Sequence, residues 1–197
     1  MHYNKMIVCP VTNNNPAEPG GSRFPPRRSP IEPRKLVEMG NRCVQQGDFR
    51  GALVAYDLAQ AVLPNDAEVA RMRALTLLRL ERVEEGLASI ERSLDLNPEH
   101  PAAYTIHGAA LVELGRCRDA LKALDLALEL NPAAPDAMYN KACAHSLLGE
   151  GDQALLWLKQ AVQAYPDYRS IARDDPNLDI LRLEPGFKPT YTEILGD

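Results

Sequence analysis

A period of 34 residues runs through most of this chain and limits what it can fold into. Prolines recur at this step, at Pro64, Pro98, Pro132 and Pro166. Small residues keep the same step in three further series, namely Gly40, Ala74, Gly108 and Ala142; Ala52, Gly86, Ala120 and Ala154; and Ala59, Ser93, Ala127 and Ala161. Four series in one phase do not arise by chance, so the chain contains four tandem copies of one structural unit.

Each copy has the pattern of two helices. In the copy from 101 to 134, apolar residues recur every three or four positions in two runs, one that ends at Gly115 and one that ends at Asn131. Glycine tolerates the backbone angles of a helix end, and the residue before a proline is pushed out of the helical region. The sequence therefore predicts first helices at about 34–46, 67–80, 101–114 and 135–148, and second helices at about 50–63, 84–96, 118–130 and 152–164.

Two helices joined by a short turn must lie antiparallel. The small residues Gly108, Ala120 and Ala127 then mark the points where helix backbones approach each other closely. One such hairpin cannot bury its own apolar surface, so each copy must pack on the next. These requirements predict a stack of helical hairpins.

The copies resemble the tetratricopeptide repeat family. The first copy matches the family pattern at Leu36, Met39-Gly40, Cys43, Gly47-Asp48-Phe49, Ala52, Tyr56, Ala59 and Pro64, and the fourth at Met138, Ala142, His145, Gly149, Ala154, Leu158, Ala161 and Pro166. The second copy departs from the pattern at its turn, where Glu81 and Arg82 stand, and at Gly86. The resemblance implies an all-α fold, a right-handed α-solenoid of tandem antiparallel hairpins, with repeats at 33–66, 67–100, 101–134 and 135–168.

The segments on either side of the repeats differ from them. Residues 1–32 are rich in Pro, Asn and Gly and predict a disordered tail, with Arg23–Arg28 as either a proline-rich docking peptide or part of an unstructured leader or misplaced start. Residues 169–197 break the period and predict a capping segment, because a solenoid needs a terminal element that is apolar on one side only. They resemble the ending of many bacterial tetratricopeptide proteins at Ala172, Asp174, Asp175-Pro176, Leu178, Leu181-Arg182, Pro185 and Phe187.

Charge and cysteine content narrow the function classes. The net charge is −5, and because residues 1–30 carry four basic residues against Glu18, the remainder carries −8. An acidic body argues against nucleic-acid binding, which requires a basic face. The four cysteines show no paired short spacing, which indicates a reducing compartment and predicts a cytoplasmic protein. No apolar run approaches the length of a membrane span.

The sequence contains no motif that predicts catalysis. A glycine-rich phosphate loop, a nucleophile elbow and a His-Glu-x-x-His pattern are all missing from it. His107 and His145 have no Cys, His or carboxylate four residues away, so we interpret them as packing residues rather than metal ligands. An enzyme would have to build its site from these two histidines and Cys143. We therefore predict a non-enzymatic protein with no cofactor and no metal.

The resemblance implies a binding groove instead, because first helices line the concave side in this family. At positions that line the groove in the family, this sequence has Val37 and Asn41; Arg71, Met72, Leu75, Leu78 and Arg79; Thr105, Ile106, Ala109 and Val112; and Tyr139, Asn140 and Cys143. Several are apolar, which predicts an exposed patch for a partner, although some could pack between neighbouring first helices instead. Arg71 and Arg79 share a helix face, and they could hold a ligand carboxylate or be simply solvated.

We therefore predict an adaptor or scaffold that binds a partner peptide or helix with apolar anchors. In the family, some members grip chaperone tails with Lys, Asn and Arg side chains. Only Asn41 matches that set here, since Val37, Met72, Ala102 and Ile106 replace its other members. Three alternatives stay open, namely a secretion-type chaperone for an apolar export substrate, a regulatory or assembly subunit of an enzyme complex, and a homo-oligomer.

Overall fold

The computed structural model describes residues 32–196. The chain divides into two units, residues 1–30 and 31–197, and the second contains the described part. Apart from Glu32, the predicted tail at 1–32 lies outside the described residues.

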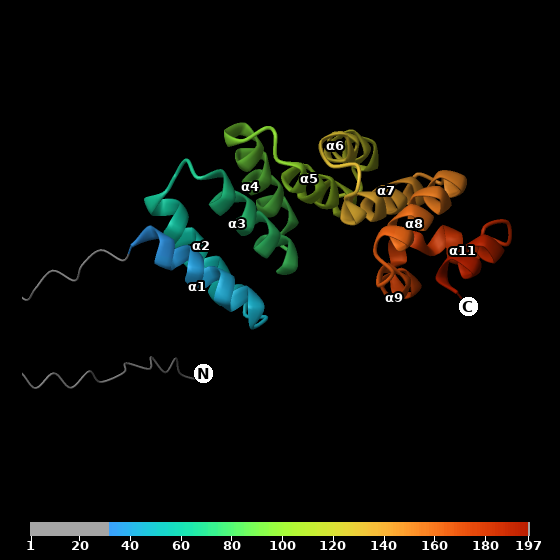
Figure 1. The fold of residues 1–197 in the computed structure, drawn as a ribbon, viewed down its shortest axis with the longest axis horizontal. Helices are drawn as coiled ribbons and strands as arrows, with labels where there is room; N and C mark the ends of the chain where they lie inside the picture. Colours follow the sequence, from blue (N-terminus) through green and yellow to red (C-terminus); the bar gives the residue numbers. More distant parts are fainter. Residues whose placement is uncertain (1–31, 197) are drawn as a thin grey trace, which may run out of the picture. The chain divides into compact units, whose positions relative to one another are not determined.

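Four antiparallel helix pairs follow one another along the chain (Figure 1). The pairs are α1 (Pro33–Gln45) with α2 (Phe49–Val62), α3 (Ala67–Arg79) with α4 (Val83–Leu96), α5 (Pro101–Glu113) with α6 (Cys117–Leu130), and α7 (Pro135–Leu147) with α8 (Gly151–Ala164). Every predicted helix end lies within one residue of the observed one, and the predicted α-solenoid is confirmed. No helix within residues 32–196 has both the length and the apolar character that crossing a bilayer requires.

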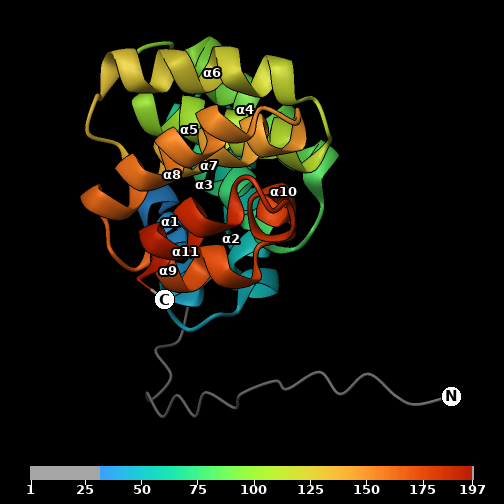
Figure 2. The same cartoon turned by 90° about the vertical axis from the view of Figure 1, so that its right-hand side faces the viewer.

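Four short elements follow the last pair. They are α9 (Tyr168–Asp174), the 3-10 turn η1 (Pro176–Leu178), α10 (Asp179–Leu183) and α11 (Lys188–Leu195). They pack on α7 and α8, and Figure 2 shows α9, α10 and α11 gathered at the C-terminal end of the stack. Leu178 and Leu181 are fully buried in this contact. The apolar side of the segment thus lies on the fourth repeat.

Small side chains let the two helices of a pair approach closely. Ala52, Ala120 and Ala154 are completely buried at equivalent positions. A methyl group added at Gly40 would lie 2.4 Å from Cε1 of Tyr56, well inside van der Waals contact. The ring of Tyr56 therefore occupies the space that a larger residue at position 40 would need.

Ion pairs join each repeat to the next at equivalent positions. They run from the second helix of one repeat to the first helix of the following one, and they are Asp57 with Arg73 at 2.6 Å, Glu91 with His107 at 3.8 Å, and Asp125 with Lys141. Each pair is partly exposed and contributes at most about 1 kcal/mol. Burial of His107 between two repeats lowers the pKa of its imidazole, and its contact with Glu91 is an ion pair only when the imidazole is protonated.

The turns inside the four repeats share one backbone geometry. Gly47, Gly115 and Gly149 adopt φ angles of 73, 70 and 77°, in the left-handed region. Glu81 takes the equivalent place in the second repeat with a φ of 60°. The departure of this turn from the family pattern has thus left its geometry intact. A residue with a Cβ is strained by about 1–2 kcal/mol in this conformation.

Replacing Glu81 with Gly should stabilise the protein. The change removes the left-handed strain but lets the unfolded chain gain entropy, so the expected net gain is about 0.5–1 kcal/mol in the free energy of unfolding. Urea denaturation followed by circular dichroism measures it. Gly115→Glu is the matched reverse change and should cost a similar amount. An unchanged or lowered midpoint for Glu81→Gly would contradict the strain.

Candidate functional site

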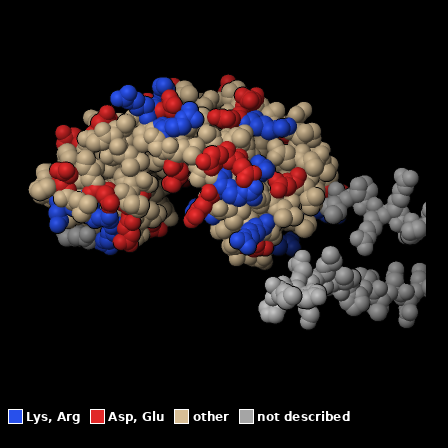
Figure 3. Space-filling model, turned by 180° about the vertical axis from the view of Figure 1, so that it is seen from behind, with Lys and Arg blue, Asp and Glu red and all other residues tan. Residues whose placement is uncertain are grey.

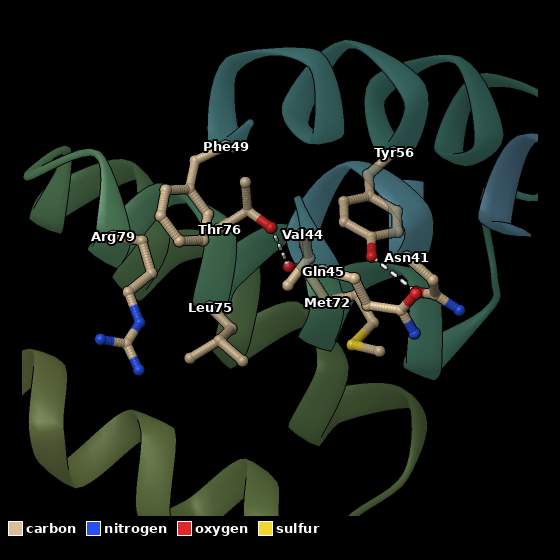
Figure 4. Close-up of a pocket in the computed structure, with 9 residues that line it drawn as sticks. All are labelled: Asn41, Val44, Gln45, Phe49, Tyr56, Met72, Leu75, Thr76 and Arg79. Atoms are coloured by element: carbon tan, nitrogen blue, oxygen red, sulfur yellow. Dashed lines mark hydrogen bonds between the residues drawn. The ribbon is translucent and has the colours of Figure 1, made fainter. Parts of the chain in front are cut away.

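Two adjoining cavities form a groove along the first helices of the repeats. The first cavity, of about 470 Å³, lies between α1, the start and middle of α2, and α3 (Figure 4). Its lining residues are Asn41, Val44, Gln45, Phe49, Tyr56, Met72, Leu75, Thr76 and Arg79. Most of this lining is apolar, and the polar groups stand at its edges.

Helical spacing places the α3 side chains on one wall of the first cavity. Met72, Leu75, Thr76 and Arg79 stand at steps of three and four residues, so they share a face of the helix. The Thr76 hydroxyl donates to the Met72 carbonyl at 2.8 Å and therefore does not face the cavity as a free donor (Figure 4).

The opposite wall comes from the first helix pair. The Tyr56 hydroxyl donates to Oδ1 of Asn41 at 2.6 Å, which leaves the amide nitrogen of Asn41 available as a donor (Figure 4). Phe49 begins α2, directly after Asp48, whose carboxylate caps the helix through the Gly51 amide. The cap fixes the chain at the point where the Phe49 ring enters the cavity wall.

The second cavity, of about 690 Å³, continues the groove along α3, α5 and α7. It is lined by Leu75, Leu78, Arg79, Glu81, Val83, Thr105, Ile106, Ala109, Glu113, Asp136, Tyr139, Asn140, Tyr168 and Ile171. Leu75 and Arg79 line both cavities, so the two form one continuous surface. Figure 3 shows the hollow in this unit, with acidic and basic side chains along its edge.

The two predicted arginines have different roles. Arg71 pairs with Glu68, whose Oε2 accepts from Nε at 2.8 Å, and this hydrogen bond lowers the pKa of Glu68. Arg71 lines neither cavity, and its charge is matched within its own helix. Arg79 is exposed, lies where the cavities meet, and has no ion pair or hydrogen bond with any residue between 32 and 196. Of the two arginines, Arg79 thus lines the cavities and Arg71 does not.

Four residues predicted to form the exposed groove surface are buried. The exposed fractions are 8% for Ile106, 4% for Val112, 6% for Tyr139 and 2% for Cys143. All four belong to the main apolar cluster, because α5 and α7 pack directly against each other and η1 packs on α7. Ile106 and Tyr139 still contribute to the floor of the second cavity, whereas Val112 and Cys143 line neither cavity.

Asp175 explains why the α7 face is closed. Its Oδ2 accepts from the Tyr139 hydroxyl at 2.7 Å and lies 3.6 Å from the Cys143 sulfur. Its Oδ1 accepts from the Asn177 amide at 2.9 Å and so caps η1. Burial, followed by the nearby Asp175 charge, raises the pKa of the Cys143 thiol well above its ordinary value. The sequence marked Asp175 only as part of a closing motif.

Two stacked tyrosine rings also join α7 to the C-terminal segment. The rings of Tyr139 and Tyr168 lie 4.4 Å apart at 16°, and the Tyr168 hydroxyl donates to Asp136. Burial raises the pKa of both phenols above their ordinary values, so they remain protonated donors. The C-terminal segment therefore covers part of the fourth repeat, and its Tyr168 and Ile171 line the second cavity together with Asp136 and Asn140 of α7.

The other predicted residues distribute between the cavities. Asn41, Met72 and Leu75 line the first, and Leu78, Thr105, Ala109 and Asn140 line the second. Val37 lies apart, in a shallow cavity at the start of α1 with Arg34 and Leu63. The sequence did not indicate seven of the lining residues, namely Phe49, Tyr56, Thr76, Glu81, Val83, Tyr168 and Ile171. An aromatic residue next to the first turn was the available signal for Phe49.

The described residues offer no metal site. No group of three His, Cys, Asp or Glu side chains is arranged to hold an ion within residues 32–196. His145 lies with its Nδ1 2.6 Å from Oε2 of Glu150, which links the end of α7 to the following turn. His107 faces Glu91 across a repeat boundary. Both histidines are thus accounted for by contacts between helices.

Comparison with known families gives two matches that together span residues 45–169. Residues 107–169 match the family described as Tetratricopeptide repeat, and residues 45–127 match the family described as Anaphase-promoting complex, cyclosome, subunit 3. Among curated proteins, Tetratricopeptide repeat protein 28 of Mus musculus is 33% identical over 98 residues. That alignment covers 46% of this chain and only 4% of the mouse protein.

Solved structures match over a larger share of the chain. TTC0263, a thermophilic TPR protein of Thermus thermophilus, gives a TM-score of 0.69 at 24% identity, covering 83% of this chain and 88% of its own. MamA 41-end from Desulfovibrio magneticus RS-1 gives 0.68 at 20% identity, covering 83% and 91%. YrrB, described as a TPR protein with an unusual peptide-binding site, gives 0.61 at 19% identity, covering 84% of each chain. At these identities the likeness concerns the fold alone.

The helix pairs, their 34-residue step and the open concave groove define a solenoid repeat protein. The family matches within residues 45–169 and the fold matches support a tetratricopeptide repeat protein.

Replacing Asp175 with Ala should loosen the C-terminal segment from α7. The change removes the acceptor for Tyr139, Cys143 and the Asn177 amide, so we expect a loss of about 1–3 kcal/mol in unfolding free energy. Cys143 should also react faster with a thiol-specific chromogenic disulfide, measured in a Cys9→Ser/Cys43→Ser background. Exposed Asp174 supplies the control, because Asp174→Ala leaves these contacts in place. Unchanged thiol reactivity in Asp175→Ala would contradict the assigned role.

Proposed function

We propose that this chain is a non-enzymatic adaptor whose groove binds a peptide or helix of a partner protein. The observation that carries the proposal is the adjoining pair of cavities along α1, α3, α5 and α7, which share Leu75 in their linings. Both volumes lie within the range of about 300–1,000 Å³ that is common for binding pockets. Apolar walls with few polar groups suit a segment that inserts large apolar side chains.

The fold family agrees with this function without proving it, since one fold serves many functions. The neighbour YrrB is described as carrying a peptide-binding site, which favours the same use of the concave side here. The partner would contribute apolar anchors to the first cavity, where Phe49, Met72 and Leu75 offer contact. We place the protein in the cytoplasm, where the free thiols of Cys117 and Cys143 would persist.

Replacing Leu75 with Glu should abolish binding through the groove. A charge at this shared lining residue would be buried by any apolar anchor, so peptides selected on the full chain from a random display library should bind at least about tenfold more weakly. Fluorescence anisotropy measures the dissociation constants. Leu156→Glu is the control, because Leu156 is 48% exposed on α8 and lines neither cavity. Equal loss in both variants, or none in Leu75→Glu, would reject the groove.

Self-association is a second candidate, and α2 carries the observation that favours it. Val54, Leu58 and Val62 are 60, 51 and 53% exposed at steps of four residues, so they form one apolar stripe. An unpaired stripe of this kind on a helix suits a second copy of the same helix. Light scattering should then show a dimer that Val54→Glu/Leu58→Glu converts to a monomer. A monomeric wild-type chain at high concentration would exclude this candidate.

A further inference from the structure

Charge is distributed unevenly along the groove. The first cavity has no carboxylate in its lining, and its one charged residue is Arg79. The second cavity shares Arg79 but adds the carboxylates of Glu81, Glu113 and Asp136. Of the two cavities, carboxylates therefore line only the second, at the turn after α3, the end of α5 and the start of α7, whereas Arg79 is the one charged group in the first.

Most of these charges have no partner within the protein. Arg79, Glu81 and Glu113 form no ion pair or side-chain hydrogen bond within residues 32–196, whereas Asp136 accepts from Tyr168. Elsewhere on the same helices, charged side chains are matched locally, as Arg71 is by Glu68. Likewise Arg82 pairs with Glu85 beside the second-repeat turn. Among the described residues of α3 and α5, the unmatched charges are thus the ones that line the groove, whereas unpaired charges on other surfaces, such as Arg118 and Glu129 on α6, line neither cavity.

The backbone at Glu81 is consistent with a use for its side chain. The three equivalent turns have glycine, and Glu81 adopts the same left-handed conformation at a cost in strain. A glycine would be more stable at this position but would remove one of the two unpaired carboxylates from the second cavity.

We infer that the partner segment is itself asymmetric in charge. One end has a large apolar side chain, which sits in the first cavity, next to a carboxylate, which lies beside Arg79. The other end carries Lys or Arg, which lies over Glu81 and Glu113. This inference rests on the proposed function of the groove and adds the chemistry and direction of the bound chain.

Electrostatic complementarity is expected to set direction and specificity more than total affinity. Each pair would be partly exposed at the rim, so losing one should weaken binding by about three- to tenfold. Apolar insertion at Leu75 would supply most of the affinity. The reverse peptide direction would put a carboxylate beside Glu113 and a cation beside Arg79, and this repulsion would disfavour it.

The experiment selects peptides from one random display library on four versions of the full chain. They are the wild type, Arg79→Gln, Glu81→Gln/Glu113→Gln, and the control Arg118→Gln/Glu129→Gln, whose residues are exposed on α6 and line neither cavity. Deep sequencing gives the residue enrichment at each peptide position. A peptide selected on the wild type is then synthesised in forward and reversed order, and its dissociation constant is measured on each version at low and high salt.

The expected result is that wild-type peptides combine an apolar anchor, an acidic residue and, on one side of it, Lys or Arg. Arg79→Gln should lose the acidic enrichment, and the double glutamine variant should lose the basic one. The wild-type peptide should weaken about three- to tenfold on each variant and with added salt. The control should resemble the wild type.

Three other outcomes are distinct. Peptides that require Leu75 but show the same enrichment on all four versions would overturn the charge inference and leave the proposed function standing. Failure to select any peptide that requires Leu75 would overturn both. Selection of purely apolar peptides that bind equally well in reversed order would likewise reject an asymmetric partner.

Discussion

Close approach between helix backbones at small residues is the contact on which the whole stack depends. At Gly40 this contact admits the ring of Tyr56, since a Cβ there would lie 2.4 Å from it. The same ring crosses the repeat and donates its hydroxyl to Asn41 on the groove side. Packing inside the first repeat and the shape of the first cavity are therefore set by one side chain. A change that disturbs the crossing would disturb the candidate site as well.

The two ends of the stack are finished in different ways, and this limits where a partner can bind. Val69 and Ala103 are buried against the preceding repeat, whereas the equivalent Lys35 keeps 63% of its side chain exposed and pairs with Glu32. The outer face of α1 is thus suited to water. At the other end the chain returns across α7 and ties Tyr139 and Cys143 to Asp175. The segment that packs on the last repeat buries Cys143 and most of Tyr139, while Asp136 and Asn140 of α7 still line the second cavity together with Ile171 of the segment itself.

Local signals were enough to predict the helices, because glycine at a turn and proline after a helix act within a few residues. Helix pairs and their order followed from the repeat. The burial of Val112 and Cys143 could not be predicted from such local signals, because a residue at the same position of a helix can be either exposed or covered. It depends on how closely α5 meets α7 and on Asp175, which is 32 residues from Cys143. Position on a repeat predicts which way a side chain points, but long-range contacts decide whether solvent reaches it.

The second repeat has a strained residue, Glu81, at its turn, and this residue lines the second cavity. Strain of about 1 kcal/mol at Glu81 is a noticeable share of a typical unfolding free energy of about 5–15 kcal/mol. In a solenoid this loss is spread, because each repeat is also stabilised by its neighbours on both sides. The second repeat is an interior one, joined to the first by Asp57 and Arg73 and to the third by Glu91 and His107. An unfavourable turn is best tolerated in an interior repeat, and Glu81 of this turn lines the second cavity. The place where the sequence breaks the family pattern is therefore also the place where a bound chain would pass.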